Sequence, residues 1–199
     1  MKVLVACEFS GVVRDAFAAK GHTAISCDLL EGEGNHYQGN VLDILDQDWD
    51  LMIAFPPCTY LCSSGLHWNK GNPVRDIKTS LAIDFVLALM DAPIEHIAVE
   101  NPVGCLSTRV RKPDQIIQPY NFGEDASKRT CFWLTNLKLL KPTLYVPGRV
   151  VNGKERWANQ TDSGQNKLSP SVDRWKKRSI TYQGVADAMA DQWSEPNAR

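Results

Sequence analysis

The sequence lacks both a long apolar run and a strong excess of charge of one sign. No stretch approaches the roughly 20 consecutive apolar residues that a membrane-spanning helix needs. The apolar amino-terminal stretch is short and stops at Glu8, unlike a signal peptide. With 22 Lys and Arg against 23 Asp and Glu, the formal net charge is -1, which disfavours strong non-specific nucleic-acid binding but permits a local basic face. We therefore expect a cytoplasmic chain that makes no membrane contact.

The sequence also lacks the cysteine and histidine spacing of a zinc site or a small disulfide scaffold. Its six cysteines are scattered, and only Cys58 and Cys62 lie close together. A structural zinc site would need a second cysteine pair or paired histidines nearby, and neither is present. Reduced thiols and no metal site are therefore expected.

Composition and hydrophobic patterning are those of a globular chain. The 199 residues, 43% of them hydrophobic, can bury one sizeable core, so we expect one compact domain over residues 1–199. Strands that alternate with helices, with few polar residues inside the strands, predict an α/β fold with a Rossmann-like, doubly wound and mostly parallel sheet. The expected strands are 2–7, 23–27, 50–54 and 94–99. The expected helices are 12–20 and 74–90, the second with apolar residues at 77, 81, 85, 86 and 89.

Polar and reactive residues follow the expected strands at their carboxyl ends, where doubly wound sheets bind ligands. By this reasoning Ser10-Gly11, Asp28, Cys58 and Glu100 meet at one edge of the sheet. Each segment also has a purely structural interpretation, such as a tight turn around a buried thiol or a turn capped by Asp28. The pairing of Cys58 with Glu100 favours the functional interpretation.

A thiol and a carboxylate in one pocket suit chemistry at the 5-position of cytosine. Cysteine attacks electron-poor carbon, and a glutamate at a strand end can protonate or hydrogen-bond a ring nitrogen. A pyrimidine base is therefore the leading substrate. A cysteine hydrolase is disfavoured because no histidine can be placed beside Cys58.

The same segments resemble the motifs of the DNA cytosine-5 methyltransferases, which use S-adenosyl-L-methionine. The resemblance extends from Val3 to about Trp193 and implies the class I methyltransferase type of fold. The matching segments are Phe9-Ser10-Gly11 for the first cofactor loop, Asp28 for the acid after the second strand, Pro56-Pro57-Cys58 for the nucleophile motif and Glu100-Asn101-Pro102 for the Glu-Asn motif.

The resemblance also implies roles for individual residues. Cys58 would add to C6 of the base while Glu100 holds N3, and the cofactor would supply the methyl group. Gly39-Asn40-Val41 resembles a Gly-Asp segment near the adenine, with an amide in place of the acid. The implied cofactor contacts are Phe9, Ser10, Gly11, Asp28, Asn40 and Pro56.

Candidate substrate contacts lie in the motif after Glu100 and in two basic segments. The segment 173–178 mixes basic residues with Trp175, which suits a phosphate backbone beside a stacking surface. Residues 181–189 resemble a shortened form of the family's last motif, which helps to close the cofactor pocket. The candidate contacts are Asn101, Lys128, Arg129, Arg174, Lys176 and Lys177.

Three departures from the family pattern bear on function. Val12-Val13-Arg14 stands where the family usually has more glycine, which predicts a different hold on the methionine end of the cofactor. The segment around Lys128 and Arg129 lacks the usual glutamine and paired arginines. Residues 134–178 form a short insert in place of the long target-recognition region, so sequence-specific reading of DNA is poorly supported.

The sequence thus predicts a DNA (cytosine-5-)-methyltransferase of a compact, phage-like form, with DNA as its partner. Three alternatives remain open at this point. In the first, the substrate is a free pyrimidine nucleotide or a single-stranded nucleic acid. In the second, a partner protein supplies DNA recognition, and in the third, the chain is a non-catalytic nucleic-acid-binding module with the same fold.

Overall fold

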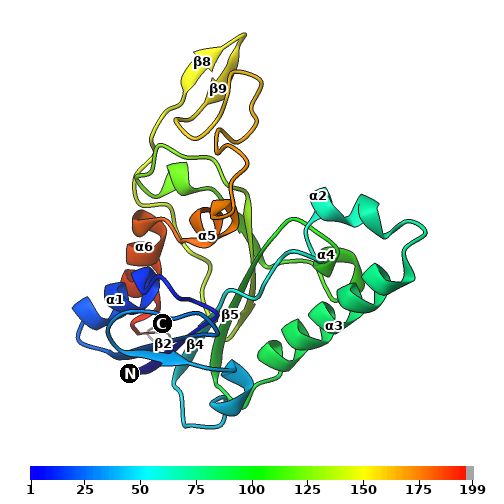
Figure 1. Ribbon diagram of the computed structural model, residues 1–199. Coiled ribbons are helices and arrows are strands. Elements are labelled where there is room, and N and C mark those ends of the chain that lie inside the picture. Colours follow the sequence, from blue (N-terminus) through cyan, green and yellow to red (C-terminus); the bar gives the residue numbers. More distant parts are fainter. Residues whose placement is uncertain (196–199) are drawn as a thin grey trace.

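A seven-stranded sheet forms the centre of the computed structural model, which describes residues 1–195 (Figure 1). The strand order is β3-β2-β1-β4-β5-β7-β6. The pairs among the first five strands are parallel, whereas β7 runs antiparallel to both β5 and β6. This confirms a mixed α/β fold with a mostly parallel, Rossmann-like sheet. The strands are β1 (Lys2–Ala6), β2 (Thr23–Asp28), β3 (His36–Gln38), β4 (Leu51–Ala54), β5 (His96–Pro102), β6 (Gln115–Ile117) and β7 (Thr130–Thr135).

Helices cover both faces of the sheet. α1 (Val12–Ala19) and α6 (Gln183–Trp193) share one apolar core with Val3 and Val5 of β1. α3 (Pro73–Met90) packs on the other face, in a second core with Leu4 of β1. Short helices α2 (Ser63–Leu66), α4 (Leu106–Arg109) and α5 (Arg174–Ser179) and three 3₁₀ turns, η1 (Val41–Asp43), η2 (His67–Asn69) and η3 (Pro119–Asn121), complete the fold. None of the helices within residues 1–195 is long and apolar enough to cross a membrane.

Helix α3 begins one residue before its predicted start, and only part of its predicted apolar series is buried. Asn72 caps it by accepting a hydrogen bond from the Arg75 amide at 3.1 Å, and Pro73 occupies the first turn. The buried residues are Thr79, Ile83, Val86 and Leu89. Ile77 and Leu81, which belong to the predicted apolar series, are each 62% exposed.

The carboxyl edge of the parallel strands is level across the sheet. Ala6 of β1 lies opposite Cys27 of β2 and Ala54 of β4, and Ala54 in turn lies opposite Val99 of β5. The chain winds from β1 toward β3 on one side and from β4 toward β5 on the other, so the switch point between β1 and β4 opens on this edge, where such sheets bind ligands. The residues that immediately follow this row are Cys7, Asp28, Phe55 and Glu100.

Strand β5 is longer than its neighbour β4 and runs beyond its predicted end. The antiparallel partner β7 continues the ladder, with Glu100 opposite Phe132 and Pro102 opposite Thr130. Glu100 therefore lies inside a strand. It still lies at the carboxyl edge, because β4 has already ended one row earlier.

A narrow arm extends from the body and contains most of the 134–178 segment (Figure 1, yellow to orange). It carries a hairpin of β8 (Arg149–Val151) and β9 (Lys154–Arg156), whose two turn residues, Asn152 and Gly153, have φ of 50° and 73°. Positive φ at both positions is the geometry that Asn-Gly favours in two-residue hairpins. Trp157 anchors the base of the hairpin, because its ring stacks on Tyr120 with centroids 3.9 Å apart.

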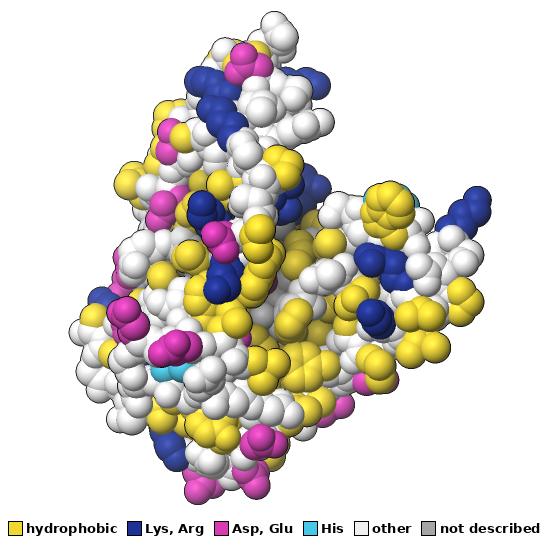
Figure 2. Space-filling model, viewed as in Figure 1, with side chains coloured by type: hydrophobic (Ala, Val, Ile, Leu, Met, Phe, Trp, Pro, Cys, Tyr) yellow, Lys and Arg dark blue, Asp and Glu magenta, His cyan; other side chains and the backbone are white. Residues whose placement is uncertain are grey.

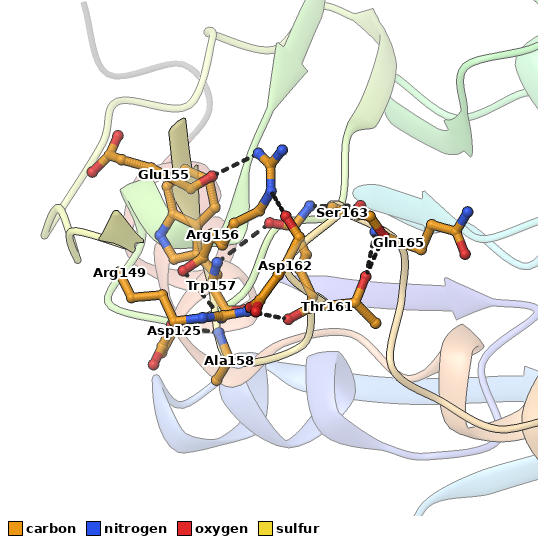
Figure 3. Close-up of polar contacts among 12 residues, drawn as sticks. Asp125, Arg149, Glu155, Arg156, Trp157, Ala158, Thr161, Asp162, Ser163 and Gln165 are labelled. Carbon is orange, nitrogen blue, oxygen red and sulfur yellow. Dashed lines mark hydrogen bonds and ion pairs between the residues drawn. The ribbon is translucent and has the colours of Figure 1, made fainter. Parts of the chain in front are cut away.

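The arginines of the arm are engaged within the arm itself (Figure 3). Arg149 forms an ion pair with Asp162 at 2.9 Å and donates to the Trp157 carbonyl, also at 2.9 Å. Arg156 donates to the Asp162 carbonyl at 3.1 Å. These contacts hold the loop that returns from the hairpin, so both guanidinium groups have a structural role here.

Candidate active site

The loop that carries Cys58 is fixed to the fold on both sides of the thiol. It leaves β4 through Phe55-Pro56-Pro57, and the Cys58 carbonyl accepts hydrogen bonds from the amides of Leu61 and Cys62, both at 3.0 Å. Before the thiol, the Asn101 side chain donates to the Pro56 carbonyl at 2.9 Å. Asn101 is fully buried, so it lies beneath the loop and positions it, whereas the sequence suggested it as a substrate contact.

The Cys58 thiol lies among charged and sulfur groups from three other segments. A hydrogen bond with the Cys62 thiol, followed by burial and the charge of Glu100, raises the pKa of Cys58 above its ordinary value. The positive charge of Lys128 acts in the opposite direction. The structure therefore brings Cys58, Glu100 and Lys128 into electrostatic contact, as expected for one site.

Cys62 is the neighbour that sequence reasoning overlooked. Its hydrogen bond with Cys58 lowers the pKa of Cys62 to about 5, and the Ser64 hydroxyl, 3.3 Å from the Cys62 sulfur, acts in the same direction. The hydrogen bond thus sets the pKa of Cys62 below that of Cys58. Its spacing of four residues from Cys58 is the signal in the sequence that points to this contact.

Selective alkylation tests this distribution of charge. At about pH 6, iodoacetamide is expected to modify Cys62 roughly tenfold or more faster than Cys58, because only the thiolate reacts. Peptide mapping by mass spectrometry measures both rates. In Cys62→Ser the pKa of Cys58 should fall toward its ordinary value, so its alkylation should become faster. Earlier modification of Cys58 in the wild-type protein would contradict the arrangement.

Glu100 lines an open hollow on the side of the sheet that α6 covers. Burial raises the pKa of the Glu100 carboxyl, while the charge of Lys128 and a hydrogen bond with Thr130 lower it in part. A carboxyl group with a raised pKa retains its proton to higher pH and can donate it. The lining residues are Phe55, Glu100, Ile117, Pro119, Lys128, Thr130, Phe132, Thr181, Tyr182, Val185 and Met189.

Four of these lining residues come from the carboxyl-terminal segment. Thr181 and Tyr182 precede α6, and Val185 and Met189 lie on it, across from Phe55 and Glu100. The 181–189 segment therefore forms one wall of the hollow, which none of the candidate cofactor contacts lines.

The loop after β1 has the backbone of a tight turn into a helix. Gly11 caps α1 with φ of 73°, a left-handed conformation that favours glycine. Ser10 donates to a carboxylate oxygen of Glu8 at 3.3 Å, and the same oxygen accepts the Val13 amide at 2.8 Å. Glu8 is buried, and burial raises its pKa. The sequence showed Glu8 only as the end of an apolar run, yet it caps the helix at the switch point.

Arg14 belongs to the segment Val12-Val13-Arg14, which departs from the glycine-rich pattern of the resembled family. Its buried guanidinium group donates to the Ser26 hydroxyl at 3.0 Å and to the Glu33 carbonyl. A Cβ atom on Gly11 would lie 2.3 Å from this group, so glycine at position 11 makes room for the arginine. Arg14 thereby ties the first turn of α1 to β2 and to the loop after β2.

Two polar residues suggested as cofactor contacts, Asp28 and Asn40, both cap local turns. One carboxylate oxygen of Asp28 accepts the Leu30 amide at 2.9 Å. Asn40 caps the 3₁₀ turn that follows it and accepts the Leu42 amide at 3.2 Å. The second oxygen of Asp28 forms no hydrogen bond within the described residues and remains available at the sheet edge.

The candidate basic contacts occupy two different places. Lys128 lines the hollow, whereas Arg129 is exposed beside it. Arg174, Lys176 and Lys177 lie on α5, outside the residues that line the hollow. Figure 2 shows Lys and Arg side chains on both flanks of a hollowed surface between the body and the lobe that carries α2 and α3.

Gly104 supports the loop from behind and offers a test of its position. The Leu61 carbonyl accepts the Cys105 amide at 2.9 Å, and a Cβ atom on Gly104 would lie 1.9 Å from that carbonyl oxygen. Gly104→Ala should therefore displace residues 61–62 and lower the free energy of unfolding by about 1–3 kcal/mol. Urea denaturation measures the loss. Val103→Ala, at a half-exposed neighbouring position, is the control and should change stability little.

Comparisons with known proteins add no family assignment. No family model matches the chain, and a search of curated proteins gives no match either.

Proposed function

We propose that this protein is a methyltransferase that acts on C5 of cytosine in DNA through a transient adduct with Cys58. The observation that carries the proposal is the convergence of Cys58, Glu100 and Lys128 at the carboxyl edge of the sheet, where their charges interact. A nucleophile that follows β4 and a proton donor on the adjacent β5 match what addition to a pyrimidine ring requires.

Cys58, Cys62 and Glu100 each carry out one part of the proposed reaction. The proton of the Cys58 thiol passes to the neighbouring Cys62 thiolate as the Cys58 sulfur bonds to C6. Glu100 donates its proton to N3, which receives the electrons displaced from the ring. Carbon 5 is then nucleophilic and is methylated. A base from solvent accepts the C5 proton, N3 returns its proton to Glu100, and the departing Cys58 sulfur regains its proton from Cys62, which restores the ring and the enzyme.

S-Adenosyl-L-methionine, when bound, supplies a methyl group activated by its sulfonium. The edge formed by Phe9, Ser10 and Gly11 fits such a molecule, since the loop turns sharply and Asp28 keeps one carboxylate oxygen available for a ribose hydroxyl. Asn40 and Pro56 border the same edge. Several contacts are already used within the protein, because Ser10 binds Glu8 and the Pro56 carbonyl binds Asn101. We infer that backbone groups and the shape of this edge contribute most of the free energy of cofactor binding. The sheet order is compatible with the class I methyltransferase type.

A second candidate substrate is a free cytosine nucleotide or a single strand. The arm supports this candidate because it is short and its Arg149 and Arg156 hold its own loop instead of projecting freely. Base extrusion from a duplex costs a few kcal/mol, and a nucleotide or single strand avoids that cost. Protein recognition of a duplex would then require a partner protein. A fold that binds nucleic acid without catalysis is the remaining alternative.

An adduct assay separates these possibilities. The protein is incubated with S-adenosyl-L-methionine and DNA that carries 5-fluorocytosine, in which fluorine blocks the loss of the C5 substituent. We expect a denaturation-resistant protein–DNA complex that requires the cofactor. Adducts only with single strands or with the fluorinated nucleotide would favour the second candidate. Cofactor binding without any adduct would leave the non-catalytic module.

A further inference from the structure

Two cysteines of the loop after β4 lie on one closed turn of the backbone. The Cys58 carbonyl accepts the Cys62 amide at 3.0 Å, which is the contact between residues i and i+4 of an α-helical turn. Four residues of such a turn advance the chain by about 6 Å. Disulfides join Cα atoms that are usually about 4.4–6.8 Å apart. The backbone therefore holds Cys58 and Cys62 at a separation that a disulfide can span.

Both ends of this turn are tied to β5 and to the residues that follow it. Before the turn, the Asn101 side chain donates to the Pro56 carbonyl at 2.9 Å. After the turn, the Ser63 amide donates to the Val103 carbonyl at 3.0 Å. The two thiols, which are hydrogen-bonded to each other, therefore remain in contact because their backbone is held from both sides.

This pair of thiols is also more open to reagents in solution than the other cysteines. Cys58 and Cys62 are both partly exposed. Cys7 is partly exposed too, but burial raises the pKa of its thiol and makes it a poor nucleophile. The three remaining cysteines, Cys27, Cys105 and Cys131, are buried. An oxidant should therefore react first at the loop after β4.

We propose that Cys58 and Cys62 are a redox-sensitive site, at which a small-molecule disulfide such as oxidised glutathione converts the two thiols into a reversible internal disulfide. The Cys62 sulfur bonds to one sulfur of glutathione disulfide and releases the other as a thiolate. The Cys58 sulfur then bonds to the Cys62 sulfur and releases the second glutathione. The two released thiolates take up the protons that the two cysteines lose. The protein thiols are thus oxidised and the glutathione disulfide is reduced.

The internal disulfide has a direct consequence for the site. Its formation ties up the Cys58 sulfur, which then cannot bond to C6 of a pyrimidine, and a reductant restores it. Formation of the disulfide does not rest on the proposed function, whereas the loss of methyl transfer does.

Disulfide mapping of the oxidised protein tests the proposal. The folded chain is incubated with oxidised glutathione, its remaining thiols are blocked with N-ethylmaleimide, and it is digested without reductant. Chymotryptic cleavage after Tyr60 separates the two cysteines. We expect the protein to lose two of its six thiols and the two fragments to stay joined until dithiothreitol is added. No loss of thiols, or glutathione bound at both cysteines without an internal bond, would overturn the proposal.

Cysteine variants identify the partners of the bond. Cys62→Ser should abolish the internal disulfide, whereas Cys105→Ala, the matched control, should form it as readily as the wild type. Cys105 is the informative control because its amide donates to the Leu61 carbonyl at 2.9 Å, next to Cys62. Circular dichroism verifies that both variants are folded. A bond between Cys62 and Cys105, or a disulfide that persists in Cys62→Ser, would contradict the assignment.

The adduct assay with 5-fluorocytosine DNA measures the consequence for the site. The oxidised protein should form at least tenfold less adduct than the reduced protein, and dithiothreitol should restore the full amount. Equal adduct from fully oxidised protein would overturn the inhibitory role of the disulfide. The mapping result stands by itself, so a protein that forms no adduct in either state would refute the proposed function and would still confirm or refute the disulfide.

Discussion

The Cys58→Ala variant is expected to lose methyl transfer to cytosine by at least about a thousandfold while it still binds S-adenosyl-L-methionine. The substitution removes the only atom that bonds to C6 in the proposed reaction. It leaves intact the backbone hydrogen bonds that the Cys58 carbonyl accepts from Leu61 and Cys62. Single-turnover transfer of a radiolabelled methyl group measures the loss, and calorimetric titration measures cofactor binding.

A second cysteine provides the matched control. Cys27 is buried in β2, away from the nucleophile loop, and Cys27→Ala should retain most of the activity once folding has been verified. Equal losses in both variants would point to damaged packing. Transfer that persists in Cys58→Ala would show that the chemistry does not proceed through this thiol.

The Glu100→Gln variant is expected to lower the rate of methyl transfer by about a hundredfold or more. An amide can hydrogen-bond N3, but it has no proton to give. In the wild-type protein, the rate should fall as pH rises through the elevated pKa of Glu100, because only the protonated carboxyl donates. The variant should lose this dependence. Single-turnover rates across a pH series measure the effect, and Glu95→Gln, at an exposed position just before β5, is the control.

The same substitution should increase stability. Because burial raises the pKa of Glu100, the native state binds more protons than the unfolded chain between the ordinary pKa and the raised one. Stability is therefore greatest below the ordinary value and decreases as pH rises through that window. Glu100→Gln removes this decrease. Its melting temperature should exceed that of the wild type at about pH 8, and the difference should vanish near pH 4. A variant less stable at every pH would contradict the buried position of the carboxyl.

Local sequence signals identified much of the fold. The strands β1 and β4 are almost wholly apolar runs, and Asn72-Pro73 marks the start of α3. The antiparallel course of β7 and its place between β5 and β6 depend on long-range pairing, which no local pattern encodes. The predicted apolar series of α3 is buried at Val86 and Leu89 but exposed at Ile77 and Leu81. Apolar periodicity gives the spacing of a face but does not say whether that face is covered.

The reactive residues of the candidate site were predicted from the sequence, but the hydrogen bonds that position them were not. Cys58 and Glu100 were found because each follows or lies in a recognisable strand and is itself reactive. The support that Asn101 gives to Pro56 was not foreseeable, since it joins residues 45 positions apart through the register of β4 and β5. The contact of Glu8 was not foreseeable either; its carboxylate accepts a hydrogen bond from the Val13 amide at the start of α1. Such contacts depend on side-chain direction, which composition and spacing leave undetermined.

The tip of the hairpin in the arm is a place where the chain can be lengthened. Its turn, Asn152-Gly153, is exposed, and a side chain added at Gly153 would meet open space. The stacked pair of Tyr120 and Trp157 holds the base of the hairpin, so chain added at the tip leaves the sheet and the Cys58 loop undisturbed. Loop tips of this kind accept inserted domains readily. The arm is therefore a suitable site for the insertion of a foreign recognition element.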